Sequence, residues 1–344
     1  MAWNQYENKR TVWRCSVDKK KKITAVVPCF NEEDVIGLFY EEMCRVAKQM
    51  EEVTEFEIMF VNDGSSDGTL EKMRQLREVD PRVCFVSFSR NFGKEAAMYA
   101  GLEHASGDFV AVIDADLQHP PELLVQMFEA VTKEGYDSAA ARRVSRTGEP
   151  KVRSFVSRSF YRVLAKLSQI EVVEGEVDYR LMSRAMVDAV LQMSERNRFT
   201  KGIFSWVGFK TKWIPYENVE RAAGQTKWSM WKLLKYSMEG IIGYSTAPLA
   251  LVSLIGILFC IGAFFAILYI VVKTIIWGDP IGGWPSLACM ILGISGIQLF
   301  CMGILGQYLG KTYLEVKNRP IYVASDVKTN RSAGDGKPDE KNGV

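Results

Sequence analysis

The stretch F-V-A-V-I-D-A-D-L-Q-H-P-P-E, residues 109–122, joins an apolar run to two carboxylates. Residues 109–113 are apolar and partly β-branched, which is the composition of a buried strand. Asp114 and Asp116 follow at the point where that strand would end. Charges in this position either cap a turn, the commoner arrangement for D-A-D taken alone, or hold a cation. The stretch therefore predicts a strand that leads into a polar site of one of these two kinds.

Short apolar runs and amphipathic segments alternate through the first half of the chain. Such alternation predicts an α/β fold with a parallel sheet and helices on both of its faces. Ligands of these sheets bind beyond the carboxyl ends of the strands. Asn31, Asp63 and the Asp114/Asp116 pair fall at such ends, so we expect them in one crevice. Strands are expected at residues 23–28, 57–64, 83–88 and 108–114, and helices at 32–48, 69–78 and 94–105.

Carboxylates that converge on one crevice repel one another, which raises their pKa values unless a cation or hydrogen-bond donors lie between them. Mg²⁺ and Mn²⁺ prefer such oxygen ligands and are usually held by one or two carboxylates together with substrate phosphates. We assign Asp116 and the side-chain oxygen of Gln118 to a metal of this kind. Asp114 is assigned to the ribose of a nucleotide or to the water shell of the metal. His119 precedes two prolines, and we expect it to have a structural role rather than to bind the metal.

Composition excludes several kinds of site. The 344 residues carry a formal net charge of +2, which says little about partners. Seven scattered cysteines, none spaced C-x-x-C, predict neither a disulfide framework nor a zinc site and fit a reducing compartment. No G-x-G-x-x-G opens an early helix, which excludes a Rossmann dehydrogenase, and we expect no nucleic-acid partner. A basic middle segment suits a phosphate-bearing partner or a membrane surface: Arg142, Arg143, Arg146, Arg153, Arg158, Arg162 and Lys166.

Two segments predict transmembrane helices. Residues 247–272 contain no charged side chain over 26 positions, which as a helix would span about 39 Å, and residues 284–309 are also uncharged. Lysine and arginine flank the pair on the outer sides, whereas the short connection contains neither. By the positive-inside rule, the soluble α/β domain and both termini are expected on the cytoplasmic side of the inner (plasma) membrane, as in a multi-pass protein.

The chain is thus expected to have five parts. The tail after the second span could pair with another subunit, so we expect contact with the bilayer and a homo-oligomer. Its polar end is expected to be disordered from about residue 326. The five parts are an N-terminal segment (1–22), a soluble α/β domain (23–226), an interfacial amphipathic helix (227–246), two transmembrane helices (247–309) and a cytoplasmic tail (310–344).

Five motifs, in this order and before two apolar segments, resemble those of inverting family 2 glycosyltransferases that charge polyprenyl phosphates. Dolichyl-phosphate mannose synthases and bactoprenol glucosyltransferases are such enzymes. The resemblance extends from about residue 23 to residue 322. It implies a GT-A fold, a nucleotide-sugar donor, Mg²⁺ or Mn²⁺ and a polyprenyl phosphate acceptor. The motifs are V-V-P-C-F-N-E-E (26–33), V-N-D-G-S-S-D-G-T (61–69), S-R-N-F-G-K-E-A-A (89–97), D-A-D-L-Q-H-P-P-E (114–122) and V-D-Y-R-L-M-S-R (177–184).

The resemblance also implies roles for particular residues. Asp63 matches the residue that accepts a hydrogen bond from the base, and Lys94 matches a position near the nucleotide. Asp178 and Arg180 match D-F-R-L, with Tyr179 in place of Phe. The first nucleotide loop is matched by Pro28, Phe30, Asn31 and Glu32, and the metal motif by Asp114, Asp116 and Gln118. Arg142, where Ala-Arg replaces the usual Ser-Arg, and Arg221 and Lys227 of a mobile loop join Arg180 as candidates to bind the acceptor phosphate.

The chemistry implied is transfer of a sugar, with inversion, from UDP-glucose or another UDP-hexose to undecaprenyl phosphate for cell-envelope glycosylation. A phosphate monoester has a second pKa of about 6, so this acceptor is already a nucleophile and needs no general base. Asp178 is then expected to orient Arg180 or position the acceptor, within a catalytic set of Asp114, Asp116, Asp178 and Arg180. Two other interpretations remain: a non-catalytic membrane scaffold or flippase partner, and a processive polysaccharide synthase, although the Q-x-x-R-W motif of such synthases is absent.

Overall fold

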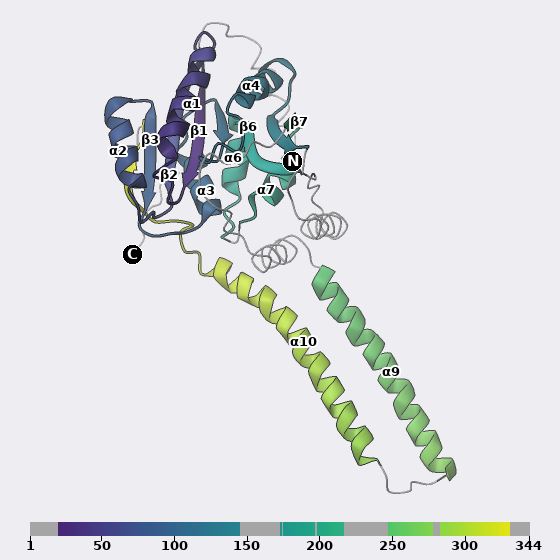
Figure 1. The fold of residues 1–344 in the computed structure, drawn as a ribbon. Helices are drawn as coiled ribbons and strands as arrows, with labels where there is room; N and C mark the ends of the chain where they lie inside the picture. The colour runs from purple at the N-terminus through teal and green to yellow at the C-terminus, as the bar shows by residue number, and fades with distance from the viewer. Residues whose placement is uncertain are drawn as a thin grey trace, which may run out of the picture.

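The structure, a computed structural model, describes residues 20–144, 173, 175–196, 198–216, 247–277 and 283–330. A globular α/β part carries two long helices that run side by side away from it (Figure 1). The expected interfacial helix at 227–246 lies outside the described residues, as do the N-terminal segment up to residue 19 and the connection between the two long helices.

One eight-stranded sheet, in the order β7-β5-β6-β4-β1-β2-β3-β8, forms the centre of the globular part. The four strands expected from the sequence are present and mutually parallel, which confirms the predicted parallel sheet. Beyond β4, the sheet continues through β6, which runs antiparallel to both β4 and β5. The strands are β1 (Lys21–Cys29), β2 (Thr54–Asn62), β3 (Val83–Phe88), β4 (Phe109–Val112), β5 (Ser138–Arg143), β6 (Glu176–Ser183), β7 (Thr211–Tyr216) and β8 (Ala324–Lys328).

Helices cover both faces of the sheet, because successive strand residues point to opposite sides. On β1, Ile23 and Val27 pack with α1, α2 and α4 on one face. Val26 packs with α3, α6 and α7 on the other. The helices are α1 (Ile36–Gln49), α2 (Thr69–Val79), α3 (Lys94–His104), α4 (Leu123–Lys133), α6 (Arg184–Gln192) and α7 (Thr200–Trp206). This layering leaves the carboxyl ends of β1, β2, β3 and β4 at one edge of the globular part, where the expected site residues lie.

The two long helices are α9 (Ala247–Trp277) and α10 (Trp284–Val316). Many of their described apolar side chains are exposed, including Phe264, Phe265 and Leu299. Within the part of the chain that is described, no helix meets the length and apolarity required to cross a membrane. The two predicted transmembrane helices are therefore present as helices, while their passage through a membrane is not confirmed.

The C-terminal tail differs from the prediction over residues 326–330, while residues 331–344 lie outside the described residues. We expected disorder from about residue 326, but Ala324–Lys328 form β8, antiparallel to β3. The Ser89 N–H donates to the Val323 carbonyl at 2.9 Å, and Arg74 forms an ion pair with Asp326 at 2.9 Å. An edge strand such as β3 offers unpaired backbone groups, and pairing with them orders a polar segment that has no strand signal of its own. The tail thus adds to the sheet of its own chain.

Candidate active site

Two loops at the carboxyl ends of β1 and β2 are joined by hydrogen bonds to backbone groups. The Asn31 side-chain oxygen accepts from the Ser66 N–H at 2.9 Å, and the Asn31 N–H donates to Ser65 Oγ at 3.0 Å. The Glu32 N–H donates to Thr69 Oγ1, also at 3.0 Å. Asn31 has φ 56°, a left-handed conformation that asparagine tolerates better than most residues. The expected first nucleotide loop is therefore held rigidly, with Phe30 exposed beside it.

Asp63 supports a third loop instead of facing the crevice. Its side chain accepts hydrogen bonds from the Phe92 N–H at 2.6 Å and the Gly93 N–H at 3.0 Å, and the residue is 3 % exposed. Burial raises the pKa of Asp63, and the two N–H donors offset only part of that effect. Both carboxylate oxygens of Asp63 brace the loop before α3, and the expected contact of Asp63 with a base stays a prediction.

Gly64 allows the loop before α3 to lie close to the loop after β2. Its φ is +66°, and a Cβ placed on it would lie 2.4 Å from the Arg90 carbonyl carbon and 2.6 Å from the Asn91 nitrogen. A side chain at Gly64 would therefore collide with backbone and would also strain the left-handed conformation. The three loops after β1, β2 and β3 form one packed unit as a result.

Lys94, the first residue of α3, lies between two carboxylates of the crevice. Its Nζ is 2.7 Å from Asp114 Oδ1 and 2.6 Å from Asp178 Oδ2, and Lys201 Nζ is 3.8 Å from Asp178. Burial disfavours the Lys94 ammonium, but attraction to Asp114 and Asp178 outweighs it and raises the pKa of Lys94. Burial likewise disfavours the Asp178 carboxylate, yet the charges of Lys94 and Lys201 hold its pKa well below the ordinary value.

The cation expected among the carboxylates is thus partly supplied by the chain itself. Repulsion between Asp114 and Asp178 is relieved by the ammonium, so that repulsion alone does not require a metal. Sequence reasoning placed Lys94 near the nucleotide but missed its contact with both acids. A lysine after F-G was a visible signal, whereas its partners come from β4 and β6 and become neighbours only in the folded sheet.

Asp116 takes part in the turn after β4. Its Oδ1 accepts from the Gln118 N–H at 3.1 Å, and Leu117 between them has φ 54°. D-A-D therefore does both things that the sequence allowed, since Asp116 caps a turn and Asp114 holds a cation. Among the described residues, no group of three or more His, Cys, Asp or Glu side chains is placed to hold a metal. Mg²⁺ commonly takes only one or two carboxylates and completes its shell with water and substrate phosphates, and the two aspartates fit that mode of binding.

His119 connects the motif to the sheet, in agreement with the structural role expected for it. Its Nδ1 is 2.7 Å from the Tyr216 hydroxyl, and its ring stacks on Tyr179 with 6.2 Å between the ring centres. Its Nε2 lies 3.9 Å from Asp114 Oδ2. Burial lowers the pKa of His119, so the neutral ring is favoured at neutral pH.

Arg180 does not occupy the place expected of it. The residue is 2 % exposed, its guanidinium pairs with Glu176 and lies 3.9 Å from the centre of the Phe204 ring, and burial lowers its pKa. In the register of the sheet, Arg180 pairs with Val112, two residues before Asp114, which places it under α7. The expected roles of Arg180 in catalysis and in binding the acceptor phosphate are therefore not supported. Asp178 pairs with Lys94, and its charge also attracts Arg180.

Of the other residues expected to bind the acceptor phosphate, only Arg142 lies among the described residues. Arg142 lies near the end of β5, where it is exposed and paired in register with Glu176. Arg221 and Lys227 lie outside the described residues. Their assignment to the acceptor phosphate stays a prediction.

Residues 24–191 match the family model described as "Glycosyl transferase family 2". A prophage bactoprenol glucosyl transferase homolog of Escherichia coli (strain K12) is 42 % identical over 309 residues, which are 89 % of this chain and 99 % of that protein. The chain belongs to glycosyl transferase family 2. The SfII prophage-derived bactoprenol glucosyl transferase of Shigella flexneri is 41 % identical over 88 % of the chain and 97 % of its own length. The protein is thus a glycosyltransferase, and the globular part is its GT-A domain.

Solved structures match this glycosyltransferase at low identity. The mannosyltransferase PcManGT from Pyrobaculum calidifontis, in complex with GDP-Man and Mn²⁺, is 15 % identical with a TM-score of 0.42, over 89 % of this chain and 93 % of that chain.

Proposed function

We propose that this glycosyltransferase transfers a hexose from a UDP-sugar, with UDP-glucose as the first candidate, to undecaprenyl phosphate, with inversion at the anomeric carbon. The observation that carries the proposal is 42 % identity to a bactoprenol glucosyl transferase homolog over 99 % of its length, combined with a crevice in which Lys94 joins Asp114 and Asp178. The product would be a polyprenyl-phosphate sugar that serves cell-envelope glycosylation.

The donor would lie over the rigid loops after β1 and β2. Exposed Phe30 offers an apolar surface for a base, and Pro28, Asn31 and Glu32 shape the loop beside it. Asp63 would act indirectly by holding the loop that ends in Lys94. The interlocked hydrogen bonds mean that this surface is formed before the donor arrives, so little ordering cost would be added on binding.

The donor diphosphate fits a divalent cation held by Asp116 and Asp114, with the Gln118 side chain beside them. Mg²⁺ or Mn²⁺ bound there would neutralise charge on the leaving diphosphate as a Lewis acid. The chain itself contributes the Lys94 ammonium, whose side chain is 42 % exposed and can reach a ligand in the crevice. Asp178 positions that ammonium, as the distance of 2.6 Å between them indicates.

In the transfer itself, an oxygen of the acceptor phosphate would form a bond to the anomeric carbon while the bond from that carbon to the diphosphate oxygen breaks. The bonding electrons leave with UDP, and no proton has to be removed from a dianionic acceptor. Asp178 is therefore proposed as a positioning residue and not as a base. Positive charge has to admit the acceptor next to the diphosphate, and Arg142, Arg221 and Lys227 remain proposed for that task.

We place the reaction at the cytoplasmic face of the inner membrane, with α9 and α10 inserted in the bilayer. The support is the uncharged sequence of residues 247–272 and 284–309 and the basic residues that flank them. Multi-pass insertion and homo-oligomer formation are parts of the proposal.

The test is incubation of the full chain in membranes with undecaprenyl phosphate, Mg²⁺ and a panel of radiolabelled nucleotide sugars. Label that enters the lipid phase from a UDP-hexose supports the proposal and identifies the sugar. Asp116→Ala and excess chelator should each reduce transfer by at least about 100-fold. Asp188→Ala, an exposed carboxylate on α6, is the matched control and should keep full activity. No label from any donor would favour the non-catalytic scaffold.

A further inference from the structure

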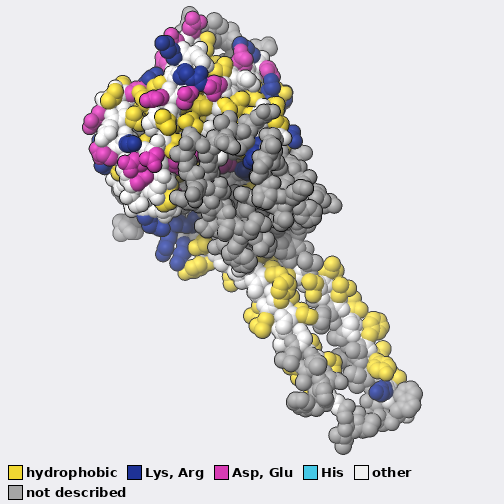
Figure 2. Space-filling view, viewed as in Figure 1, with side chains coloured by type: hydrophobic (Ala, Val, Ile, Leu, Met, Phe, Trp, Pro, Cys, Tyr) yellow, Lys and Arg dark blue, Asp and Glu magenta, His cyan; other side chains and the backbone are white. Residues whose placement is uncertain are grey.

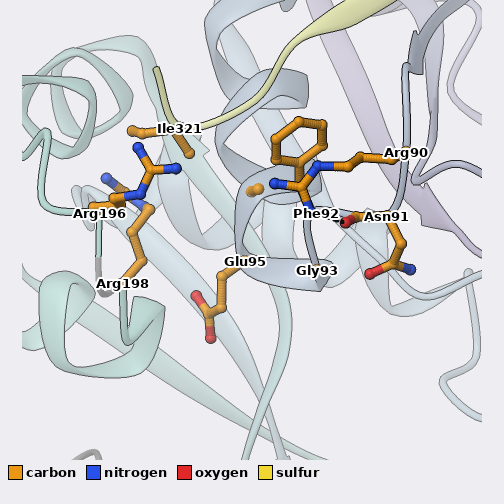
Figure 3. Close-up of a pocket in the computed structure, with 9 residues that line it drawn as sticks. Arg90, Asn91, Phe92, Gly93, Glu95, Arg196, Arg198 and Ile321 are labelled. Atoms are coloured by element: carbon orange, nitrogen blue, oxygen red, sulfur yellow. Dashed lines mark hydrogen bonds between the residues drawn. The ribbon is translucent and has the colours of Figure 1, made fainter. Parts of the chain in front are cut away.

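A second cavity lies against the first turn of α3. It has a volume of about 340 Å³ and is bounded by the loop from Arg90 to Gly93, by Glu95 and by Arg196, Arg198 and Ile321 (Figure 3). Lys94 points into the catalytic crevice, where it binds Asp114 and Asp178, while the adjacent Glu95 lines this cavity. The two sites are thus neighbours on different sides of the same helical turn.

Three arginines converge on this cavity from two distant segments. Figure 3 shows the Arg90 side chain on one side and those of Arg196 and Arg198 on the other, with Ile321 beside them. The Arg90 guanidinium lies 4.3 Å from the centre of the Phe92 ring and makes a long hydrogen bond of 3.4 Å to the Asn91 carbonyl. The Arg196 guanidinium donates to the carbonyls of Arg319 at 2.7 Å and Pro320 at 3.1 Å.

The positive charge in this cavity is balanced only in part by nearby acids, since the Glu195 carboxylate attracts Arg198. Among the described residues, no carboxylate oxygen forms an ion pair with the guanidinium of Arg90 or Arg196. Glu95 accepts hydrogen bonds from the N–H and the hydroxyl of Thr200, which occupies one oxygen of its carboxylate. Like charges held together around a cavity repel one another, and an anion between them removes that cost.

We propose that this cavity binds a phosphate group and is a site separate from the one for the donor diphosphate. Guanidinium groups match phosphate oxygens with paired hydrogen bonds, and arginines facing each other can hold one phosphate from both sides. Among the described residues, the Arg90 guanidinium makes one long hydrogen bond, to the Asn91 carbonyl at 3.4 Å, so we take it as the principal contact. Arg196 places its charge on the opposite wall while it fixes the chain that leaves α10.

The position of the cavity indicates where its ligand comes from. The Arg196 N–H donates to the Glu315 carboxylate near the end of α10, so the cavity lies where that helix joins the globular part. Figure 2 shows Lys and Arg side chains gathered beside this junction. If α10 enters the bilayer, which rests on the proposed function, a lipid headgroup can reach the site. A soluble phosphate offers the same chemistry.

The test uses full-length protein in detergent, with saturating UDP and Mn²⁺ present to fill the catalytic crevice. Binding of inorganic phosphate is measured by titration calorimetry at constant ionic strength. We expect Arg90→Gln to weaken binding about 10-fold, because a charge-assisted contact is removed. Arg90→Lys keeps the charge but loses the planar guanidinium group, so its affinity for phosphate should lie between that of the parent and that of Arg90→Gln. Lys133→Gln, on α4, removes one exposed charge elsewhere and should bind like the parent.

A second arm compares short-chain phosphatidic acid with short-chain phosphatidylcholine as soluble probes. Tighter binding of phosphatidic acid than of inorganic phosphate, weakened in Arg90→Gln, would identify a lipid headgroup as the ligand. Inorganic phosphate binding at least as tightly would identify a soluble one. Equal affinities in the parent, Arg90→Gln and Arg196→Gln for both probes, or no binding by the parent, would overturn the proposal.

These binding measurements do not depend on turnover. If the parent binds phosphate in an Arg90-dependent way but transfers no sugar, the proposed function is overturned and this inference is not. Intact transfer to the lipid acceptor without Arg90-dependent phosphate binding would overturn this inference alone.

Discussion

The two sides of the catalytic crevice are held together by different forces. On the side of β1 and β2, loops 30–33 and 63–69 are joined by hydrogen bonds to backbone groups, two of which are accepted by the carboxylates of Asp67 and Glu33. On the side of β4 and β6, Asp114 and Asp178 are joined by the ammonium of Lys94. The first contacts are short-range hydrogen bonds to the backbone, whereas the second are attractions between opposite charges that are only partly buried and that salt screens.

This difference suggests that the two sides of the crevice have different functions. Loops fixed by many backbone hydrogen bonds keep one shape and suit the recognition of a constant group such as a nucleotide. An ammonium that is 42 % exposed can exchange a carboxylate partner for an incoming phosphate at low cost. We infer that the donor side is preformed and that the ionic corner, formed by Lys94, Asp114 and Asp178, adjusts during the reaction. The four predictions that follow test this contrast.

Replacing Lys94 by Met should have the largest effect, and mainly on activity. Asp114 and Asp178 would face each other without the ammonium, and a negatively charged ligand would be repelled. We expect sugar transfer to fall by about 100-fold or more, with a loss of only ~1 kcal/mol in unfolding free energy because the pair is partly exposed. Lys133→Met is the control. Transfer near the parent rate in Lys94→Met would show that the ionic corner is dispensable.

Gly64→Ala tests the rigid side through stability. The added Cβ would overlap the backbone of Arg90 and Asn91 and would occupy a left-handed conformation. We expect a loss of about 3 kcal/mol or more in unfolding free energy, measured by denaturant titration. Gly135→Ala is a matched control, since Gly135 also has positive φ, +75°, but a Cβ there would meet nothing within 4 Å. Equal losses in the two variants would mean that close packing at Gly64 contributes nothing.

Two substitutions of Asn31 separate the effect of backbone strain on stability from the effect of a lost hydrogen bond in the first loop. Asn31→Ala removes the acceptor for the Ser66 N–H and places alanine at φ 56°, so we expect a loss of about 2 kcal/mol. Asn31→Gly relieves the strain and loses only the hydrogen bond, and its loss should be about half as large. Donor affinity, measured with UDP, should follow the same order. A smaller loss for Ala than for Gly would contradict the conformational argument.

Lowering the pH should change the contributions of Asp63 and Asp178 to stability in opposite directions. These are the smallest of the four predicted effects. The pKa of Asp63 is raised, so its contribution to stability grows as the pH falls through that raised pKa. The pKa of Asp178 is lowered, so its contribution is complete above the ordinary value of 3.8 and is lost as the pH falls through the lower one.

The measurement is the unfolding midpoint of the parent, Asp63→Asn and Asp178→Asn from neutral pH down to about pH 3. The stability of the parent relative to Asp63→Asn should rise with acid, and its stability relative to Asp178→Asn should fall. Slopes of the same sign would show that the two carboxylates do not differ as their surroundings indicate.

The sequence by itself determined the parallel sheet and the place of the crevice. Alternation of apolar runs and amphipathic segments depends on local periodicity, and D-A-D after the run at 109–113 marks a strand end without reference to any other segment. Asn31 and Asp114 could therefore be placed near one another from the local pattern alone, and the family resemblance added Lys94. The family could be recognised for the same reason, since its motifs are short and lie on these loops.

Tertiary structure alone decided which partner each charged group would find. The register between β4 and β6 places Arg180 beside Val112 and under α7, and the approach of the loop before α3 takes both oxygens of Asp63. Pairing with the open edge of β3 gives the polar tail a strand that its own composition does not predict. Charges and edges act over distances that chain order does not encode, so the groups that neutralise them become known only when the sheet is assembled.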